Sequence, residues 1–228
     1  MATEKQSRKE LLEEPDPVTV TLHRIAAFFV AYHKPIIGGV AVLLLAVASV
    51  SGYFYYQHQR ETAASELFAQ AMSNYQAVVA EGGTDEQFET VKQGFRHILD
   101  DYGNTSVADL ALVQYAATHY KSGDFEGAVS HYEKALDRLG RTHTFREMAV
   151  NGIAYSHEAL GDYENAITYF EMVADDPGSA TRDQALFKLG ELYAATGDPE
   201  KSQGAYEEIV TTHTDSMYFE IAKDRLRG

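Results

Sequence analysis

Three segments of the sequence repeat one pattern, and this repetition limits the fold more than any other feature. The segments are residues 109–139, 147–177 and 183–213. Each contains a helical pattern that leads into a Gly-Asp pair, and successive pairs are 38 and 36 residues apart. Glycine lets the backbone leave one helix, and the aspartate can cap the next helix. The period therefore predicts helix pairs that stack, because one pair alone cannot bury its apolar face.

The positions around each Gly-Asp pair follow a common order. A small residue, which lets two helices approach closely, comes four residues after the aspartate, and an aromatic residue follows four positions later. These signature positions are Gly123, Asp124, Ala128 and Tyr132; Gly161, Asp162, Ala166 and Phe170; and Gly197, Asp198, Ser202 and Tyr206. This order resembles the tetratricopeptide repeat, which implies an α-solenoid.

The repeat domain is expected to extend beyond the three clear copies, over residues 58–228. A degenerate unit at 61–103 has one helix from about Glu61 to Ala80 and a second through 88–103. In that second helix, Phe95 and Ile98 stand where the other units have their aromatic and apolar residues. Residues 216–227 are expected to form a capping helix that closes the last face of the stack.

A long uncharged run precedes the repeats, with no charge between Lys34 and Arg60. Its apolar part, Ile36 to Tyr56, would form a helix roughly 30 Å long, enough to cross a bilayer core. We therefore expect a transmembrane helix at 35–57. A cleaved signal peptide, with 46–48 (AVA) as its cleavage site, is one alternative. However, more than thirty residues precede the run, and it continues past residue 48. A buried core helix is the other alternative, but such a helix rarely lacks charge on every side.

The basic residues near this run predict its orientation. Five basic residues precede the run: Lys5, Arg8, Lys9, Arg24 and Lys34. After the run, Arg60 is the one basic residue before Lys92. The positive-inside rule places the N-terminus in the cytoplasm and the repeats on the other side, the periplasm in a bacterium.

The segments before the run are expected to differ from each other. Residues 1–17 are polar, end in Pro-Asp-Pro, and are expected to be a disordered cytoplasmic tail. Residues 18–34 are expected to form a juxtamembrane amphipathic helix, either as the start of the anchor or lying on the inner leaflet. The residues at helical spacing are Val18, Leu22, Ile25, Phe29 and Tyr32.

The charge of the chain excludes some partners. Of its 19 basic and 34 acidic residues, six and five lie in the first sixty positions. The rest therefore holds 13 basic and 29 acidic residues, a net charge of −16 that repels nucleic acid. The chain has no cysteine, so it has no disulfide and no thiolate metal site.

No sequence motif indicates catalysis, and we expect no enzymatic activity, no cofactor, no metal and no small-molecule substrate. A weaker alternative is a metal-dependent envelope enzyme that uses His119 and His157. These histidines occupy equivalent places in successive units, where the third unit has Tyr193. The simpler interpretation is that each replaces the packed tyrosine.

The first helices of a helix-pair solenoid line its concave face. We expect a protein-binding groove there that is aromatic and weakly polar, and therefore suited to an apolar segment or a partner's helix. The alternative is that its residues only pack helix pairs. The predicted groove residues are Val113, Ala117, Tyr120, Asn151, Tyr155, Phe187 and Glu191.

The order of these features resembles the YfgM-like family. An FF-x(4)-K pattern runs from Phe28 to Lys34. The apolar run that follows ends in GYFYY at 52–56, before divergent helical repeats. That resemblance implies a single-span inner-membrane protein ancillary to the SecYEG translocon, which also contacts periplasmic chaperones and exported chains. A scaffold for envelope assembly or cell division is the alternative function.

Overall fold

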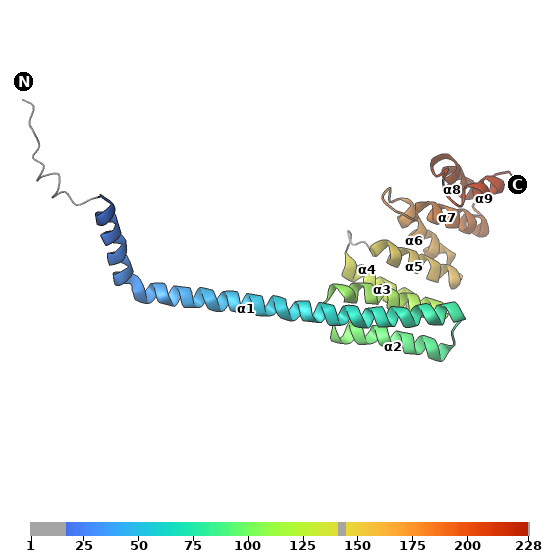
Figure 1. The fold of residues 1–228 in the computed structure, drawn as a ribbon. Helices are drawn as coiled ribbons and strands as arrows, with labels where there is room; N and C mark the ends of the chain where they lie inside the picture. The colour runs from blue at the N-terminus through green and yellow to red at the C-terminus, as the bar shows by residue number, and fades with distance from the viewer. Residues whose placement is uncertain (1–16, 141–144, 228) are drawn as a thin grey trace, which may run out of the picture. The chain divides into compact units, whose positions relative to one another are not determined.

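The computed structural model describes residues 17–140 and 145–227, and the regular structure in these ranges is α-helical (Figure 1). The expected tail at 1–17 falls almost entirely on residues 1–16, which lie outside the described residues. The chain divides into two units, Met1–Gln57 and His58–Gly228. The predicted fold class is confirmed: an all-α chain with a long apolar N-terminal helix and a tetratricopeptide-type solenoid.

Helix α1 (Pro17–Glu81) supplies the described part of the first unit. A kink interrupts it at Tyr32, whose φ and ψ of −112° and 16° are not helical, three residues before Pro35. The cause is Pro35, because proline lacks an N–H and its ring collides with the carbonyl one turn earlier. The kink therefore falls near the end of the segment 18–34, just before the uncharged run.

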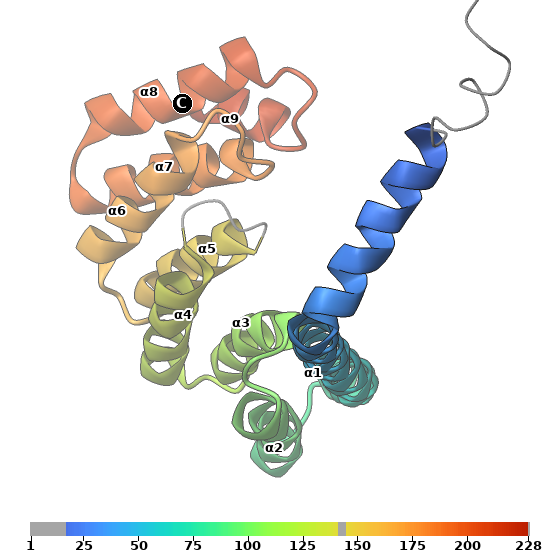
Figure 2. The same cartoon turned by 90° about the vertical axis from the view of Figure 1, so that its left-hand side faces the viewer.

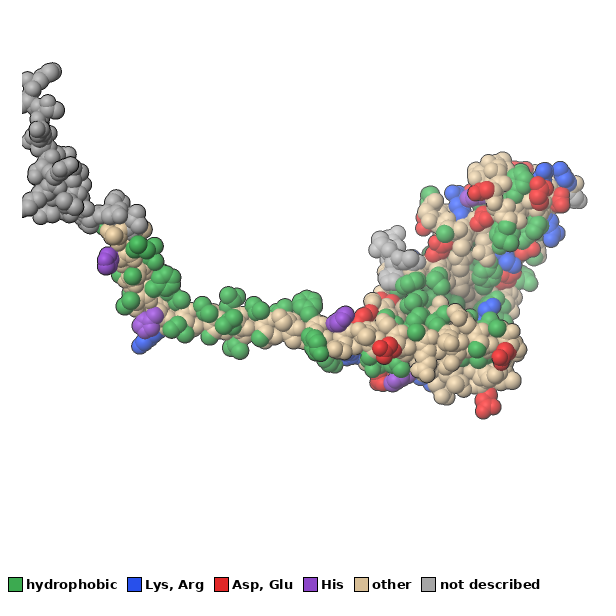
Figure 3. All heavy atoms as spheres, viewed as in Figure 1, with side chains coloured by type: hydrophobic (Ala, Val, Ile, Leu, Met, Phe, Trp, Pro, Cys, Tyr) green, Lys and Arg blue, Asp and Glu red, His purple; other side chains and the backbone are tan. Residues whose placement is uncertain are grey.

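The uncharged run itself is helical, and its apolar side chains are exposed on all sides. Leu43, Leu44 and Leu45 are each more than 60% exposed. The hydroxyl of Ser49 donates to the Leu45 carbonyl at 2.8 Å, so this polar group is satisfied within the helix. The apolar side chains stand out along this helix in Figure 3. By length and composition alone, the helix can cross a membrane.

The second unit begins with the remainder of α1 and continues through a series of helices that each pack on the next (Figure 2). The pairs α3–α4, α5–α6 and α7–α8 correspond to the three sequence repeats. The helices are α2 (Asp85–Asp101), α3 (Ser106–Lys121), α4 (Phe125–Leu139), α5 (Arg146–Ala159), α6 (Tyr163–Ala174), α7 (Arg182–Thr196), α8 (Pro199–Thr212) and α9 (Phe219–Arg225).

Each Gly-Asp pair forms the turn within a helix pair. The three glycines have φ values of 74–85°, a conformation that side chains disfavour. Each aspartate caps the following helix: Asp124 accepts from the Gly127 amide at 2.9 Å, and Asp162 and Asp198 make the equivalent bonds. The turn chemistry predicted from the sequence is therefore the chemistry that the structure uses.

The small and aromatic signature residues form the buried contacts between the helices. All six are at most 6% exposed. Ser202 donates from α8 to the Gly190 carbonyl of α7 at 2.7 Å, which shows how closely these helices approach. The rings of Tyr132 and Tyr206 lie over Gly152 and Gly190, where a β-carbon would fall within 2.5 Å of ring atoms. The rings fit because these two positions have no side chain.

Carboxylates near the start of one unit also bond to the segment that begins the next unit. Glu147 of α5 accepts hydrogen bonds from the Ser179 hydroxyl at 2.8 Å and the Thr181 amide at 3.0 Å, just before α7. Glu61 accepts from Ser106 and Val107 at the start of α3. Asp183 of α7 accepts from Ser216, before α9, at 2.5 Å. Each carboxylate therefore fixes the start of the next unit.

The C-terminal segment packs on the last repeat. The Tyr218 ring stacks on Phe187 with centroids 4.8 Å apart, and Ala222 of α9 is fully buried. Residues 141–144, between the first and second clear repeats, lie outside the described residues.

The contact between Tyr132 and Gly152 gives a test of this packing. Gly152→Ala forces a methyl group into the ring and should lower the free energy of unfolding by about 1–3 kcal/mol. Gly204→Ala is the control, since Gly204 lies in α8 with no atom within 4 Å of its β-carbon position. The control should be neutral or stabilising by up to about 1 kcal/mol. Urea unfolding of the full chain measures both, and equal effects would contradict the packing account.

The Glu147 carboxylate gives a pH-dependent prediction. Burial acts to raise its pKa, but the hydrogen bonds from Thr181, Ser179 and Ala180 outweigh burial, so the pKa is lowered from 4.5. A lowered folded-state pKa means stability that is complete above the unfolded-state value and is lost as pH falls through the folded-state value. Glu147→Gln should cost about 1–2 kcal/mol at pH 7, and the cost should shrink below pH 4.5.

Urea unfolding across this pH range measures the effect. The matched control is Glu133→Gln, at an exposed position on α4, which should change little at any pH. A Glu147→Gln penalty that did not vary with pH would show that the carboxylate charge is not what links these units.

Candidate protein-binding groove

A pocket of about 520 Å³ opens on the first helices of the three clear repeats. Helices α3, α5 and α7 supply most of its wall, because these helices follow one another on the same side of the stack. The start of α6 adds one further ring. The lining residues are Tyr120, Tyr155, Glu158, Ala159, Tyr163, Lys188, Glu191, Leu192 and Ala195.

One ammonium group that lines the pocket lies between two carboxylates. Lys188 donates to Glu158 of α5 at 3.0 Å and to Glu191 on its own helix at 3.2 Å. Burial acts to lower the Lys188 pKa, but the two carboxylates outweigh it, and the pKa is raised. The ammonium group therefore stays charged at neutral pH, and the residues that line the pocket include two glutamates and this one lysine.

Tyrosine rings form the pocket walls. The Lys188 ammonium lies 5.8 Å from the Tyr155 ring centroid, and Lys121 lies 5.9 Å from that of Tyr120. Burial raises the pKa of both tyrosines, and the charge of Glu158 adds to the shift at Tyr120. The Tyr155 hydroxyl accepts from Gln184 at 2.7 Å, which fixes the ring. Tyr163 is 40% exposed and presents an open ring.

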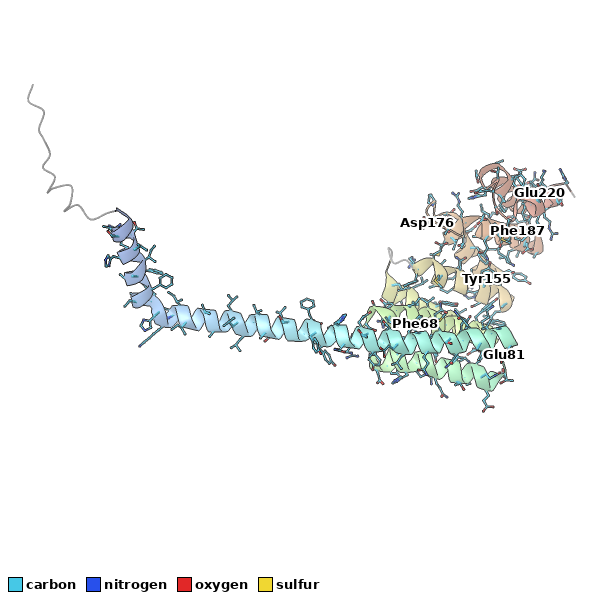
Figure 4. The ribbon with its side chains drawn as sticks, in the orientation of Figure 1. Phe68, Glu81, Tyr155, Asp176, Phe187 and Glu220 are labelled. Atoms are coloured by element: carbon cyan, nitrogen blue, oxygen red, sulfur yellow. The ribbon has the colours of Figure 1, made fainter. Side chains whose placement is uncertain are left out.

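The structure brings together three of the seven predicted groove residues, Tyr120, Tyr155 and Glu191. Figure 4 shows Tyr155 and Phe187 on successive first helices. Phe187 packs against Tyr206 and Tyr218 instead of lining the pocket. Asn151 donates to the Thr181 hydroxyl at 2.9 Å, between repeats.

Of the other two predicted groove residues, one is in the core and one packs against it. Val113 is 1% exposed, and Ala117 packs against the same apolar cluster of α3–α5. For these two positions the structure favours the packing role. Six further lining residues were not predicted from the sequence: Glu158, Ala159, Tyr163, Lys188, Leu192 and Ala195. Extending the three- and four-residue spacing toward the ends of the first helices reaches Glu158, Ala159 and Ala195, but not the other three.

The two histidines of the metal hypothesis pack within their own repeats. His119 Nδ1 lies 2.6 Å from Asp124 Oδ2, and its ring lies 4.7 Å from that of Tyr115. His157 Nδ1 lies 3.0 Å from Asp162, and its ring stacks on Tyr169. These histidine–carboxylate pairs were not predicted from the sequence, where each aspartate was interpreted only as a helix cap.

His119 also lies beside His131, with ring centroids 4.7 Å apart. Burial, followed by the charge of His119, lowers the His131 pKa to about 4, so His131 is neutral at neutral pH. Within residues 17–140 and 145–227, no group of three or more histidine, aspartate or glutamate side chains could hold a metal ion.

The comparisons with known proteins agree with this architecture. The chain matches the tetratricopeptide repeat-like domain family over residues 26–225 and belongs to that family. No curated protein matches it.

Two solved structures share the fold at low identity. A tetratricopeptide repeat protein from Parabacteroides merdae is 15% identical with a TM-score of 0.56, over 71% of this chain and 59% of that one. A Podosopora anserina protein, described as a kinesin light chain with nearly identical TPR-like repeats, is 17% identical. Its TM-score is 0.60 over 72% of this chain and 84% of that one. The chain thus spans less than two thirds of the Parabacteroides protein.

Proposed function

We propose that the protein is a membrane-anchored protein–protein interaction module of the bacterial envelope, and that its groove holds a segment of a partner. The pocket of about 520 Å³ on α3, α5 and α7 is the observation that carries this proposal. Tetratricopeptide folds serve protein binding, and a pocket shared by three successive repeats can read a segment longer than one residue. The other predicted groove residues then support the groove through their packing and through contacts between repeats. They are Val113, Ala117, Asn151 and Phe187.

Three observations support anchoring through residues 35–57. The apolar side chains of this stretch are exposed in the first unit. The family match begins at residue 26, ahead of the uncharged run, so that run is part of the matched domain. The kink at Tyr32 allows residues 18–34 to lie along the inner leaflet while the following helix crosses the bilayer. The bias of basic residues supports an orientation with the N-terminus in the cytoplasm and the repeats in the periplasm.

The partners that we propose are subunits of the SecYEG translocon, periplasmic chaperones and exported chains. The resemblance to the YfgM-like family supports this choice. An anchor in the inner membrane would raise the local concentration of the groove beside a membrane complex, so that a weak contact suffices. No catalytic step is part of this function.

Photocrosslinking in native membranes tests the proposal. The full chain carries p-benzoylphenylalanine in place of Tyr163, whose exposed ring lies at the pocket, or in place of Ser130, an exposed residue on the second helix α4. We expect adducts with translocon subunits or periplasmic chaperones from position 163, at least several-fold more abundant than from position 130.

Two results would contradict parts of this function. Equal adducts from both positions, or none from position 163, would remove the groove as the binding surface. Division or wall-synthesis proteins from position 163, without translocon subunits or chaperones, would instead support the scaffold alternative and leave the groove in place.

A further inference from the structure

The two glutamates that line the pocket, Glu158 and Glu191, each have a carboxylate oxygen that Lys188 does not contact. Lys188 contacts Oε1 of Glu158 and Oε2 of Glu191. The second oxygen of each carboxylate has no donor among the described residues. The side chains of Glu158 and Glu191 are 25% and 35% exposed, so an occupant would cover them. An apolar occupant would strip water from these oxygens without replacing their hydrogen bonds, which is costly.

The domain around the pocket is negatively charged, like the two glutamates that line the pocket. Residues 61–228 carry 29 acidic and 13 basic side chains. An acidic occupant would meet two carboxylates at the pocket and a negative field around it, and Lys188 is already engaged by both glutamates. Charge complementarity therefore selects a basic partner segment.

The pocket walls suit one kind of cation in particular. Tyr120 and Tyr155 already have ammonium groups within 6 Å of their ring centroids, so these rings accept cations. Tyr163 has no cation, ring or hydrogen-bond partner among the described residues and is 40% exposed. A guanidinium group is planar, stacks on such a ring and presents several donors in one plane to carboxylates. Ala159, Leu192 and Ala195 supply the apolar remainder of the wall.

We infer that the pocket reads an arginine side chain, inserted between Tyr163 and the Glu158–Glu191 pair, from a partner segment whose neighbouring residues are apolar. This inference rests on the proposed groove function and specifies the chemistry of the partner. The arginine would donate hydrogen bonds to the carboxylate oxygens of Glu158 and Glu191 that Lys188 does not contact. The apolar residues beside the arginine would cover the small and aliphatic residues of the pocket wall.

A selection from a random twelve-residue peptide library tests the inference without assuming a natural ligand. The full chain, purified in mild detergent, is compared with Glu158→Gln/Glu191→Gln, with Tyr163→Ala and with the control Glu133→Gln/Glu164→Gln. The control removes two exposed glutamates of α4 and α6 and has the same net charge as the first variant. Unfolding midpoints check that each variant is folded.

We expect peptides selected on the unmodified chain to share an arginine among apolar residues. Replacing that arginine by glutamine should weaken binding about tenfold. Glu158→Gln/Glu191→Gln should abolish the difference between the two peptides, whereas the control should retain it. Tyr163→Ala should weaken the arginine peptide several-fold.

The failure of the inference is distinguishable from the failure of the groove. Selected peptides that need Tyr163 but contain no basic residue, or whose arginine preference survives Glu158→Gln/Glu191→Gln, would overturn the arginine pocket and leave groove binding intact. An arginine preference lost equally in the control would indicate attraction by net charge alone and would also overturn it. Selected peptides insensitive to every pocket variant, or no selected peptides, would overturn the groove itself.

Discussion

The close approach of aromatic rings to residues without side chains sets how closely the helices pack, both within a repeat and between repeats. Tyr132 of α4 lies over Gly152 of the next repeat, and Tyr206 of α8 lies over Gly190 of its own repeat. Each ring fills space that a β-carbon would otherwise occupy, so helix separation depends on the glycine and the ring together. Because first helices are held at fixed separations on one side of the stack, their side chains can line a continuous surface.

Carboxylates near the start of each unit add polar contacts between neighbouring units. Glu61, Glu147 and Asp183 each bond to the segment before the following unit. Lys188 adds a contact between α5 and α7 through Glu158 on the pocket side. These polar contacts orient neighbouring repeats, while the buried rings set their spacing. The pocket therefore results from the alignment of three units and has no counterpart in a single repeat.

Much of the repeat architecture could be predicted because it depends on local chemistry. Three local features can be read directly from the sequence: the glycine at positive φ, the aspartate that caps the next helix, and the small residue four positions after that aspartate. The groove was harder to predict, since contacts between repeats decide which first-helix residues face outward. Val113 and Phe187 have the right spacing, but the core and Tyr218 cover them, whereas Tyr163 reaches the pocket from the start of a second helix. The His119–Asp124 pair escaped notice because one aspartate both caps a helix and holds a histidine.

The central claim is that partners bind the side of the stack formed by the first helices. Hydrogen–deuterium exchange of the full chain, with and without a bound partner segment, tests it most directly. We expect added protection around the pocket, at the C-terminal turns of α3, α5 and α7 and the start of α6, with α4 and α8 unchanged. Protection confined to α4 and α8, with none at the pocket, would contradict the account and place the binding surface on the other side of the stack.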